Sequence, residues 1–155
     1  SDLRKKLKKS RIVVFYPHIE DTYEAEIDDL IEMVFSLADA NPDAGFHITI
    51  DDSNILRGFT ARGSLSGSVK KLAIAGRSKG IRGLFITHRL GWLPTLMNGN
   101  LSGLILMSMN GSDADFAQKK FGLDFTELIS ELGEFRWSVV DLLTDKIHRF
   151  DPVKM

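Results

Sequence analysis

The chain has 155 residues, of which 43% are hydrophobic and 26% are charged, and its formal net charge is −1. This size fits one domain with a substantial core, and the charge excludes a whole-protein field that attracts nucleic acid or an anionic membrane. The chain has no cysteine, which excludes disulfides, thiolate catalysis and zinc-thiolate sites. No apolar run approaches the roughly 18 residues of a membrane span, and the N-terminus lacks the pattern of a secretory signal.

Strand and helix patterns alternate along most of the chain. The first half of the chain is expected to form a basic helix at 3–9, a strand at 11–16, a helix from Thr22 to about 39, a strand ending at Asp51 and a polar loop at 52–64. A helix at 65–79 closed by Gly80, a strand at 82–87, a short helix near 92–98 and a strand at 102–107 are expected next. The last part is expected to form helices at 113–120 and 125–132 and strands at 135–140 and 146–150. This alternation predicts a single α/β domain over 1–155, with a mostly parallel sheet, helices on both faces and a C-terminal β-hairpin.

Two carboxylates, Asp51 and Asp52, follow directly after a β-rich run that begins at Gly45. Charges at the rim of a sheet are costly unless a cation or a proton-transfer role holds them there. In nucleoside triphosphatases, the first acid of such a pair holds Mg²⁺ and the second positions the attacking water. The alternative is a solvated turn, because Asp and Asn are ordinary turn residues.

A second strand, at 82–87, also ends in polar residues, namely Thr87, His88 and Arg89. In open α/β sheets the chemistry lies at the carboxyl ends of the strands. If the two strands are neighbours, the acids and His88 share one rim of the sheet. This convergence favours a functional site over a solvated turn.

Three segments, Ile48–Leu56, Leu72–Ile81 and Leu84–Pro94, resemble the HerA/FtsK superfamily of DNA-pumping ATPases in order and spacing. This superfamily includes the genome-packaging ATPases of membrane-containing and archaeal viruses. Its pattern is an apolar strand ending in Asp-Glu, a helix ending in a Gly-Arg-x-x-Gly-like turn, and a strand ending in Thr-Gln-Arg-Pro. The tail from Glu134 to Pro152 is similar too, so the resemblance covers nearly the whole chain from Arg11.

The resemblance implies a RecA/ASCE-like core that uses ATP and Mg²⁺, and it assigns roles to particular residues. Asp51 matches the acid that holds Mg²⁺ through water, and Asp52 stands where the family has its catalytic Glu. His88 takes the sensor position, where Gln contacts the γ-phosphate; its charge depends on pH. Arg77 is the candidate arginine finger for a neighbouring subunit, and Arg89 is the second candidate.

The family also has a phosphate-binding loop, Gly-x-x-x-x-Gly-Lys-Ser/Thr, before the first strand seen here. The segment 58–65 has the glycine spacing, but Ser64 and Leu65 replace the Lys and Ser/Thr, and it follows the Asp-Asp strand. The chain is therefore expected to be the Walker-B and sensor half of an incomplete core. Its first residue is Ser1 rather than Met, which predicts a fragment, a processed product or a piece with residues left by a tag.

The resemblance implies several partners: double-stranded DNA, further copies of the chain in a ring, and a P-loop segment that fills a gap in the sheet. It implies a location in the host cytoplasm or the virion. Basic residues expected to contact DNA are Arg57, Arg62, Lys70 and Lys71 in the stretch 57–71, and the basic segment 1–10 is a further candidate. The alternative for the stretch 57–71 is a flexible surface loop, and the alternative for the segment 1–10 is a solvated helix face.

Two other functions remain open. One is a catalytically inert relative that serves as a structural or DNA-binding subunit. The other is an unrelated receiver-like or flavodoxin-like module in which Asp51 and Asp52 bind Mg²⁺ for another purpose.

Overall fold

The computed structural model describes residues 23–53, 56, 58–60, 62–65, 67–107, 111–122, 137–144 and 146–150. The elements expected at 3–9, 11–16 and 125–132 lie outside these ranges, as do Thr22 and Arg57. The chain divides into two compact units, one of Ser1–Ile50 with Ser66–Leu84, and one of Asp51–Leu65 with Phe85–Met155. No helix in the described ranges is both long enough and apolar enough to cross a membrane.

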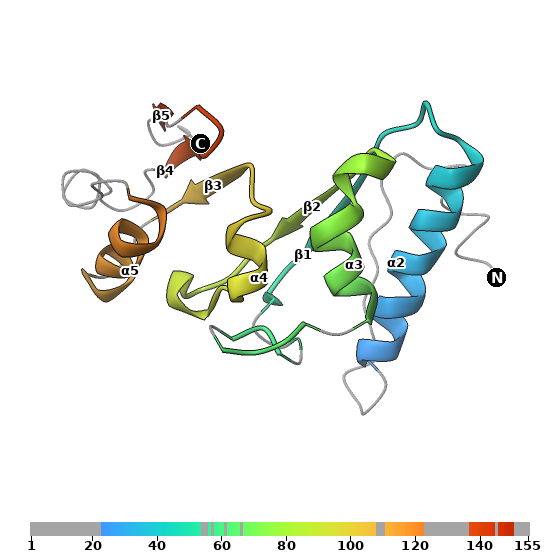
Figure 1. Ribbon diagram of the computed structural model, residues 1–155, viewed down its shortest axis with the longest axis horizontal. Helices are drawn as coiled ribbons and strands as arrows, with labels where there is room; N and C mark the ends of the chain where they lie inside the picture. The colour runs from blue at the N-terminus through green and yellow to red at the C-terminus, as the bar shows by residue number, and fades with distance from the viewer. Residues whose placement is uncertain are drawn as a thin grey trace, which may run out of the picture. The chain divides into compact units, whose positions relative to one another are not determined.

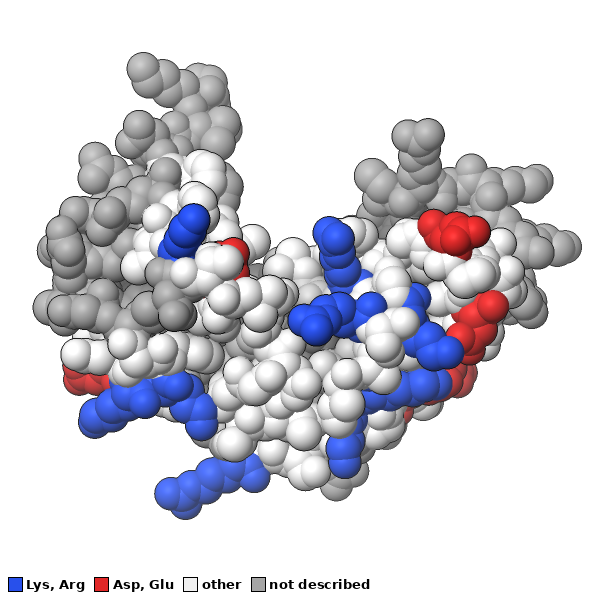
Figure 2. Space-filling view, turned by 45° about the horizontal axis from the view of Figure 1, so that its top comes forward, with Lys and Arg blue, Asp and Glu red and all other residues white. Residues whose placement is uncertain are grey.

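The first unit contains α2 (Tyr23–Ala40), β1 (Phe46–Ile50), α3 (Gly67–Ala75), the 3₁₀ turn η2 (Arg77–Lys79) and most of β2 (Ile81–Phe85). Helices α2 and α3 pack against each other (Figure 1). Its buried apolar side chains recur at helical spacing in α2 and at alternate positions in β1: Ile27, Ile31, Val34, Phe35, Ala38, Ile48 and Ile50. The amphipathic pattern therefore gives α2 one buried stripe. Figure 2 shows Lys and Arg side chains gathered beside Asp and Glu side chains on one face of this unit.

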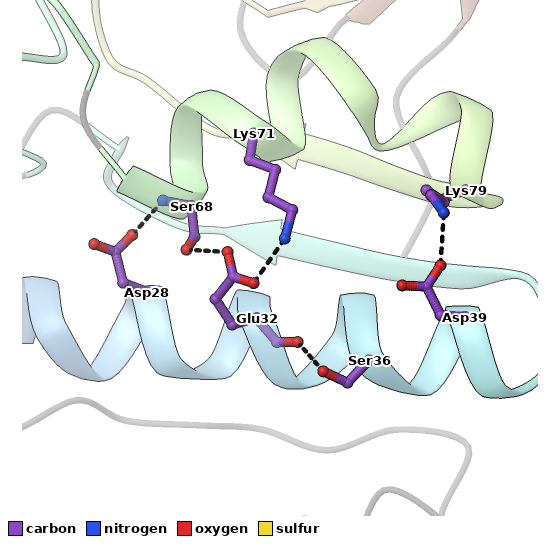
Figure 3. Close-up of polar contacts among 7 residues, drawn as sticks. All are labelled: Asp28, Glu32, Ser36, Asp39, Ser68, Lys71 and Lys79. Atoms are coloured by element: carbon purple, nitrogen blue, oxygen red, sulfur yellow. Dashed lines mark hydrogen bonds and ion pairs between the residues drawn. The ribbon is translucent and has the colours of Figure 1, made fainter.

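Polar contacts join α2 to the start of α3 (Figure 3). The Asp28 carboxylate accepts the Ser68 N–H at 2.8 Å, while Glu32 accepts the Ser68 hydroxyl and the Lys71 ammonium, each at 2.7 Å. The hydrogen bond from Lys71, followed by that from Ser68, holds the pKa of Glu32 below its ordinary value. Gly67 has a φ of +54°, and a Cβ there would collide with the Asp28 carboxylate, so this helix start requires glycine.

Helix α3 ends earlier than expected. It stops at Ala75, and the residues up to Gly80 form a separate 3₁₀ turn. Gly76 is buried, where a Cβ would meet the carbonyl oxygens of Leu72 and Ile81, and Gly80 closes the turn at a left-handed φ of 69°. The Gly-x-x-x-Gly spacing therefore produces a tight connection into β2.

The second unit contains η3 (Leu90–Trp92), α4 (Thr95–Asn98), β3 (Gly103–Leu106), α5 (Gly111–Phe121), β4 (Trp137–Asp141) and β5 (Lys146–Phe150). Its core is formed by Leu104, Leu106, Ala117 and Val140, with Leu90 packed against them. The predicted C-terminal hairpin is confirmed: β4 and β5 pair antiparallel, from Trp137↔Phe150 to Asp141↔Lys146.

The α/β class is confirmed, but the described strands form two sheets. β1 and β2 make a parallel pair, whereas β3, β4 and β5 make an antiparallel sheet in that order. The sheet was expected to be mostly parallel. Among the described strands, however, more pairs are antiparallel than parallel, because β3 pairs with the C-terminal hairpin. Helices were expected on both faces of the sheet. Helix α2 contacts β1, in which Ile48 and Ile50 are buried, whereas His47 and Thr49 are exposed.

Candidate functional site

The two acids lie in a turn directly after β1. The Asp52 N–H donates to Asp51 Oδ1 at 2.9 Å, and the Ser53 N–H donates to the carbonyl oxygen of Ile86 at 2.8 Å. Ser53 is fully buried, whereas both acids are exposed. Asp52 has a φ of 48°, the left-handed region that few residues other than Gly, Asn and Asp adopt. The turn therefore buries its serine and presents its carboxylates outward.

The structure brings the predicted sensor to the second acid. His88 Nε2 lies 3.7 Å from Asp52 Oδ1, with 77% of the His88 side chain and 53% of the Asp52 side chain exposed. The hydrogen bond between Ser53 and Ile86 places the segment after β2 beside the segment after β1. The expectation that these strand ends share a rim is thus met for Asp52 and His88.

Arg89 pairs with an acid that was not predicted from the sequence. Its Nε lies 3.6 Å from Oδ2 of Asp113, a carboxylate in the first turn of α5 with only 7% of its side chain exposed. The other oxygen of Asp113 accepts the Gly91 N–H at 3.1 Å. An acid at the start of a predicted helix was the available signal, because carboxylates are favoured near helix N-termini. This contact gives Arg89 a role within its own subunit.

Arg77 lies at the opposite end of β1 from the acids. It is an exposed residue of η2, and the Phe46 N–H at the start of β1 donates to the carbonyl oxygen of Gly80 at 3.0 Å. An open hollow of about 460 Å³ at this end is lined by Arg77, Arg82 and His47, among other residues.

The predicted DNA-binding residues differ in their surroundings. Lys70 and Lys71 lie on α3, within the helix expected at 65–79. Lys71 is held by Glu32, and its ammonium lies 4.3 Å from the centre of the Phe35 ring. Lys70 and Arg62 are exposed. Arg62 and Lys70 are therefore better placed than Lys71 to contact a ligand.

The glycines of segment 58–65 serve the loop itself. Gly58 has a φ of 78°, and a Cβ there would collide with the carbonyl of Ser64. A Cβ at Gly63 would collide with the carbonyl of Gly58. Leu65 is buried, and Phe59 is buried with its ring 6.1 Å from that of Phe85. The glycine spacing is thus explained by the close approach of backbone atoms within the loop. This agrees with the sequence prediction that the segment is not a P-loop.

The donors at the acid turn fit a hydrated magnesium ion better than a metal caged by protein. Within the described residues, no three or more His, Asp or Glu side chains are grouped so that they could hold a metal. Mg²⁺ commonly keeps several waters and takes one or two carboxylates together with substrate phosphates. The exposed Asp51 carboxylate at a strand end fits that kind of site.

Together, the parallel β1-β2 pair, the helices beside it and the antiparallel sheet define an ATPase-like α/β fold. No family model matches the chain, and no curated protein sequence matches it. Solved structures do. The genome-packaging NTPase B204 of Sulfolobus turreted icosahedral virus 2, in complex with ATP-γS, matches with a TM-score of 0.80 at 13% identity, over 97% of this chain and 72% of that one.

Two further structures agree. The DNA-packaging ATPase B204 of Sulfolobus turreted icosahedral virus gives a TM-score of 0.72 at 15% identity, over 97% of this chain and 77% of that one. The virus 2 protein in complex with AMPPCP gives 0.74 at 13% identity, over 98% and 72%. The resemblance to viral genome-packaging ATPases is therefore confirmed at the level of the fold. This favours the ATPase fold over the receiver-like or flavodoxin-like alternative.

Proposed function

We propose that this chain supplies the acid-and-sensor half of an ATPase that translocates double-stranded DNA, as in viral genome packaging. The observation that carries the proposal is the meeting of Asp52 and His88 after two parallel strands, in a fold similar to that of B204. The ATP-γS and AMPPCP complexes of B204 support ATP as the substrate. The corresponding location is the host cytoplasm or the virion.

In this mechanism, Asp52 orients the water that attacks the γ-phosphate and accepts its proton. His88 reads the γ-phosphate by donating a hydrogen bond. The separation of 3.7 Å between Asp52 Oδ1 and His88 Nε2 allows one water to lie at hydrogen-bond distance from both atoms. Asp51 would hold Mg²⁺, which would supply charge neutralisation at the phosphates when bound.

Arg77 serves the nucleotide of a neighbouring copy in a ring. Its exposure and its place at the amino end of β2 support this role, because the acids of the same chain follow the carboxyl end of β1. Arg89 is less suited to be the arginine finger, since the buried Asp113 already engages it. A guanidinium supplied in this way stabilises the charge of the transition state.

DNA contacts are assigned to Arg57, Arg62 and Lys70, with Lys71 contributing mainly to the contact between α2 and α3. These residues interact with backbone phosphates, which carry no base sequence. Such contacts suit a motor that moves along any DNA sequence.

The phosphate cradle comes from a P-loop segment outside these residues. Large apolar side chains on or next to β2 and β3 are exposed, which supports this: Leu84 at 43%, Ile105 at 56% and Met107 at 63%. Exposed apolar surface of this kind is commonly covered by another segment or chain.

The test is a Mg-ATP titration of this chain and of a longer form that includes a P-loop segment, hereafter the completed ATPase. Micromolar binding and hydrolysis by the completed ATPase are expected, both weakened by Asp51→Ala. Tight, Asp51-dependent ATP binding by the 155 residues alone would contradict the assigned source of the cradle. Binding of DNA without any ATP hydrolysis by the completed form would favour the inert subunit instead.

A further inference from the structure

Asp113 is the only charged residue among the buried polar side chains of the described chain, and the mechanism above does not use it. It lies in the first turn of α5, and α5 packs against η3. Burying a carboxylate is costly unless it is paired and hydrogen-bonded. Two partners that help to repay this cost, Gly91 and Arg89, lie in the segment that carries His88.

We infer that Asp113 is a positioning residue that holds His88 against Asp52 by anchoring the sensor loop, residues 86–92. One carboxylate oxygen accepts the Gly91 N–H at 3.1 Å, and the other lies 3.6 Å from Arg89 Nε. A single side chain thus fixes the backbone and a side chain of the same loop. The catalytic part of this inference rests on the proposed function, whereas the anchoring itself does not.

The loop is fixed on both sides of His88. Before it, the carbonyl oxygen of Ile86 accepts the Ser53 N–H at 2.8 Å, which joins the loop to the turn that carries Asp52. After it, Asp113 holds Arg89 and Gly91, and the side chain of Leu90 packs against the core of the unit. The His88 side chain is 77% exposed. Because solvent surrounds the imidazole, its place beside Asp52 depends on the backbone that carries it.

Hydrogen bonds within the sensor loop connect Arg89, which Asp113 holds, to Thr87 on the other side of His88. The Thr87 hydroxyl donates to the carbonyl oxygen of Arg89 at 3.2 Å, and the Arg89 N–H lies 3.4 Å from the same hydroxyl. Residues 87 and 89 therefore bracket His88 in a small turn. Releasing Arg89 would loosen this turn directly.

The first test needs no substitution. In the wild-type 155-residue chain, hydrogen exchange followed by NMR is expected to show the Gly91 amide exchanging at least about 100-fold more slowly than in an unstructured peptide, because Asp113 accepts its hydrogen bond. Exchange of the Gly91 amide at the unstructured rate would overturn the proposal.

The second test follows the imidazole. The ring ¹³C–¹H signals of His88 are recorded in the wild type, Asp52→Ala, Asp113→Ala and Asp113→Asn. Removing the anchor is expected to move the His88 signals toward their position in Asp52→Ala. The matched control is Asp115→Ala, because Asp115 is an exposed acid on the same helix, and it should leave the signals in place. His88 signals that stay at the wild-type position in a folded Asp113 variant would refute the role.

A catalytic measurement then separates positioning from stability. In the completed ATPase, Asp113→Asn is expected to lower kcat about 10- to 100-fold, with the KM for ATP changed less than about twofold, since small displacements of a catalytic group have effects of that size. Asp113→Glu should recover part of the loss. If the wild-type completed ATPase does not hydrolyse ATP, the proposed function fails, and the exchange and imidazole measurements still decide the anchor. Loss of ATP affinity with kcat retained would contradict positioning.

Discussion

The polar contacts between α2 and α3 contrast with those at the acid turn. Glu32 accepts hydrogen bonds from Ser68 and Lys71 at 2.7 Å each, whereas Asp52 meets His88 at 3.7 Å on a left-handed backbone. The first set consists of short, direct bonds between protein groups. The second has the spacing of groups that share a water or a ligand. The two regions therefore differ in whether a water or a ligand can lie between the paired groups.

The strongest test of this contrast is Asp52→Asn in the completed ATPase. We expect kcat to fall at least about 100-fold, because the amide cannot accept the proton of the attacking water. The free energy of unfolding should change by less than about 0.5 kcal/mol, as for most exposed positions. Steady-state kinetics and denaturant unfolding measure the two effects.

The matched control is Asp39→Asn, which changes an exposed carboxylate paired with Lys79 at 2.7 Å. It should leave kcat at the wild-type value. A large loss of stability in Asp52→Asn with activity retained would reverse the assignment of the two regions.

Gly67→Ala tests the polar contacts between α2 and α3. We expect it to lower the free energy of unfolding by about 2 kcal/mol, since a side chain at φ +54° is strained and would displace the Asp28 carboxylate. Denaturant unfolding followed by circular dichroism measures the change. Gly45→Ala is the control, because a Cβ at Gly45 has no atom within 4 Å and its φ is not left-handed. Equal effects of both substitutions would show that the start of α3 does not require glycine.

Lys70 and Lys71 are neighbours in sequence, and they sharpen the comparison further. Lys70→Ala is expected to weaken double-stranded DNA binding a few-fold and to lower the slope of log affinity against log salt by about 1, as for a lost phosphate contact. Lys71→Ala should change the slope less, because Glu32 holds its ammonium. Fluorescence anisotropy across a salt series measures both variants. A larger effect of Lys71 would place the DNA on the α2–α3 contact.

The smallest expected effect is that of Glu32→Gln on stability. The pKa of Glu32 is lowered in the folded chain by its hydrogen bonds from Lys71 and Ser68, relative to an ordinary value of 4.5. Its contribution is therefore complete above the unfolded pKa and is lost as the pH falls through the lower folded pKa. At neutral pH we expect a loss of about 0.5 kcal/mol, because the pair is half-exposed and screened by solvent.

Unfolding of the wild type and Glu32→Gln at neutral pH and at about pH 3 checks this sign. The difference between the two proteins should narrow at the lower pH. A difference that widens with acid would mean that the hydrogen bonds of Glu32 do not favour its charged form.

The meeting of the strand ends was predictable from sequence because neighbouring parallel strands place their carboxyl ends at one rim of the sheet. Asp52 and His88 each follow an apolar run, and parallel pairing brings them together. The pairing of Arg89 with Asp113 was not predictable, because it joins two segments whose packing depends on tertiary structure. The ion pair between Lys71 and Glu32 was not predictable for the same reason, because the two residues lie on different helices. The sequence therefore indicated a DNA contact for Lys71. The early end of α3 reflects the buried Gly76, whose close contacts do not follow from helical periodicity.

The backbone at Asp52 also limits which amino acids evolution can place there. At a φ of 48°, only Gly, Asn and Asp are tolerated readily. Of these three, Asp alone carries a negative charge at neutral pH. A longer acid such as Glu would reach further toward a water but would strain the turn. Under the proposed function, the shape of the backbone and the need for a base restrict this position independently, and aspartate meets both demands.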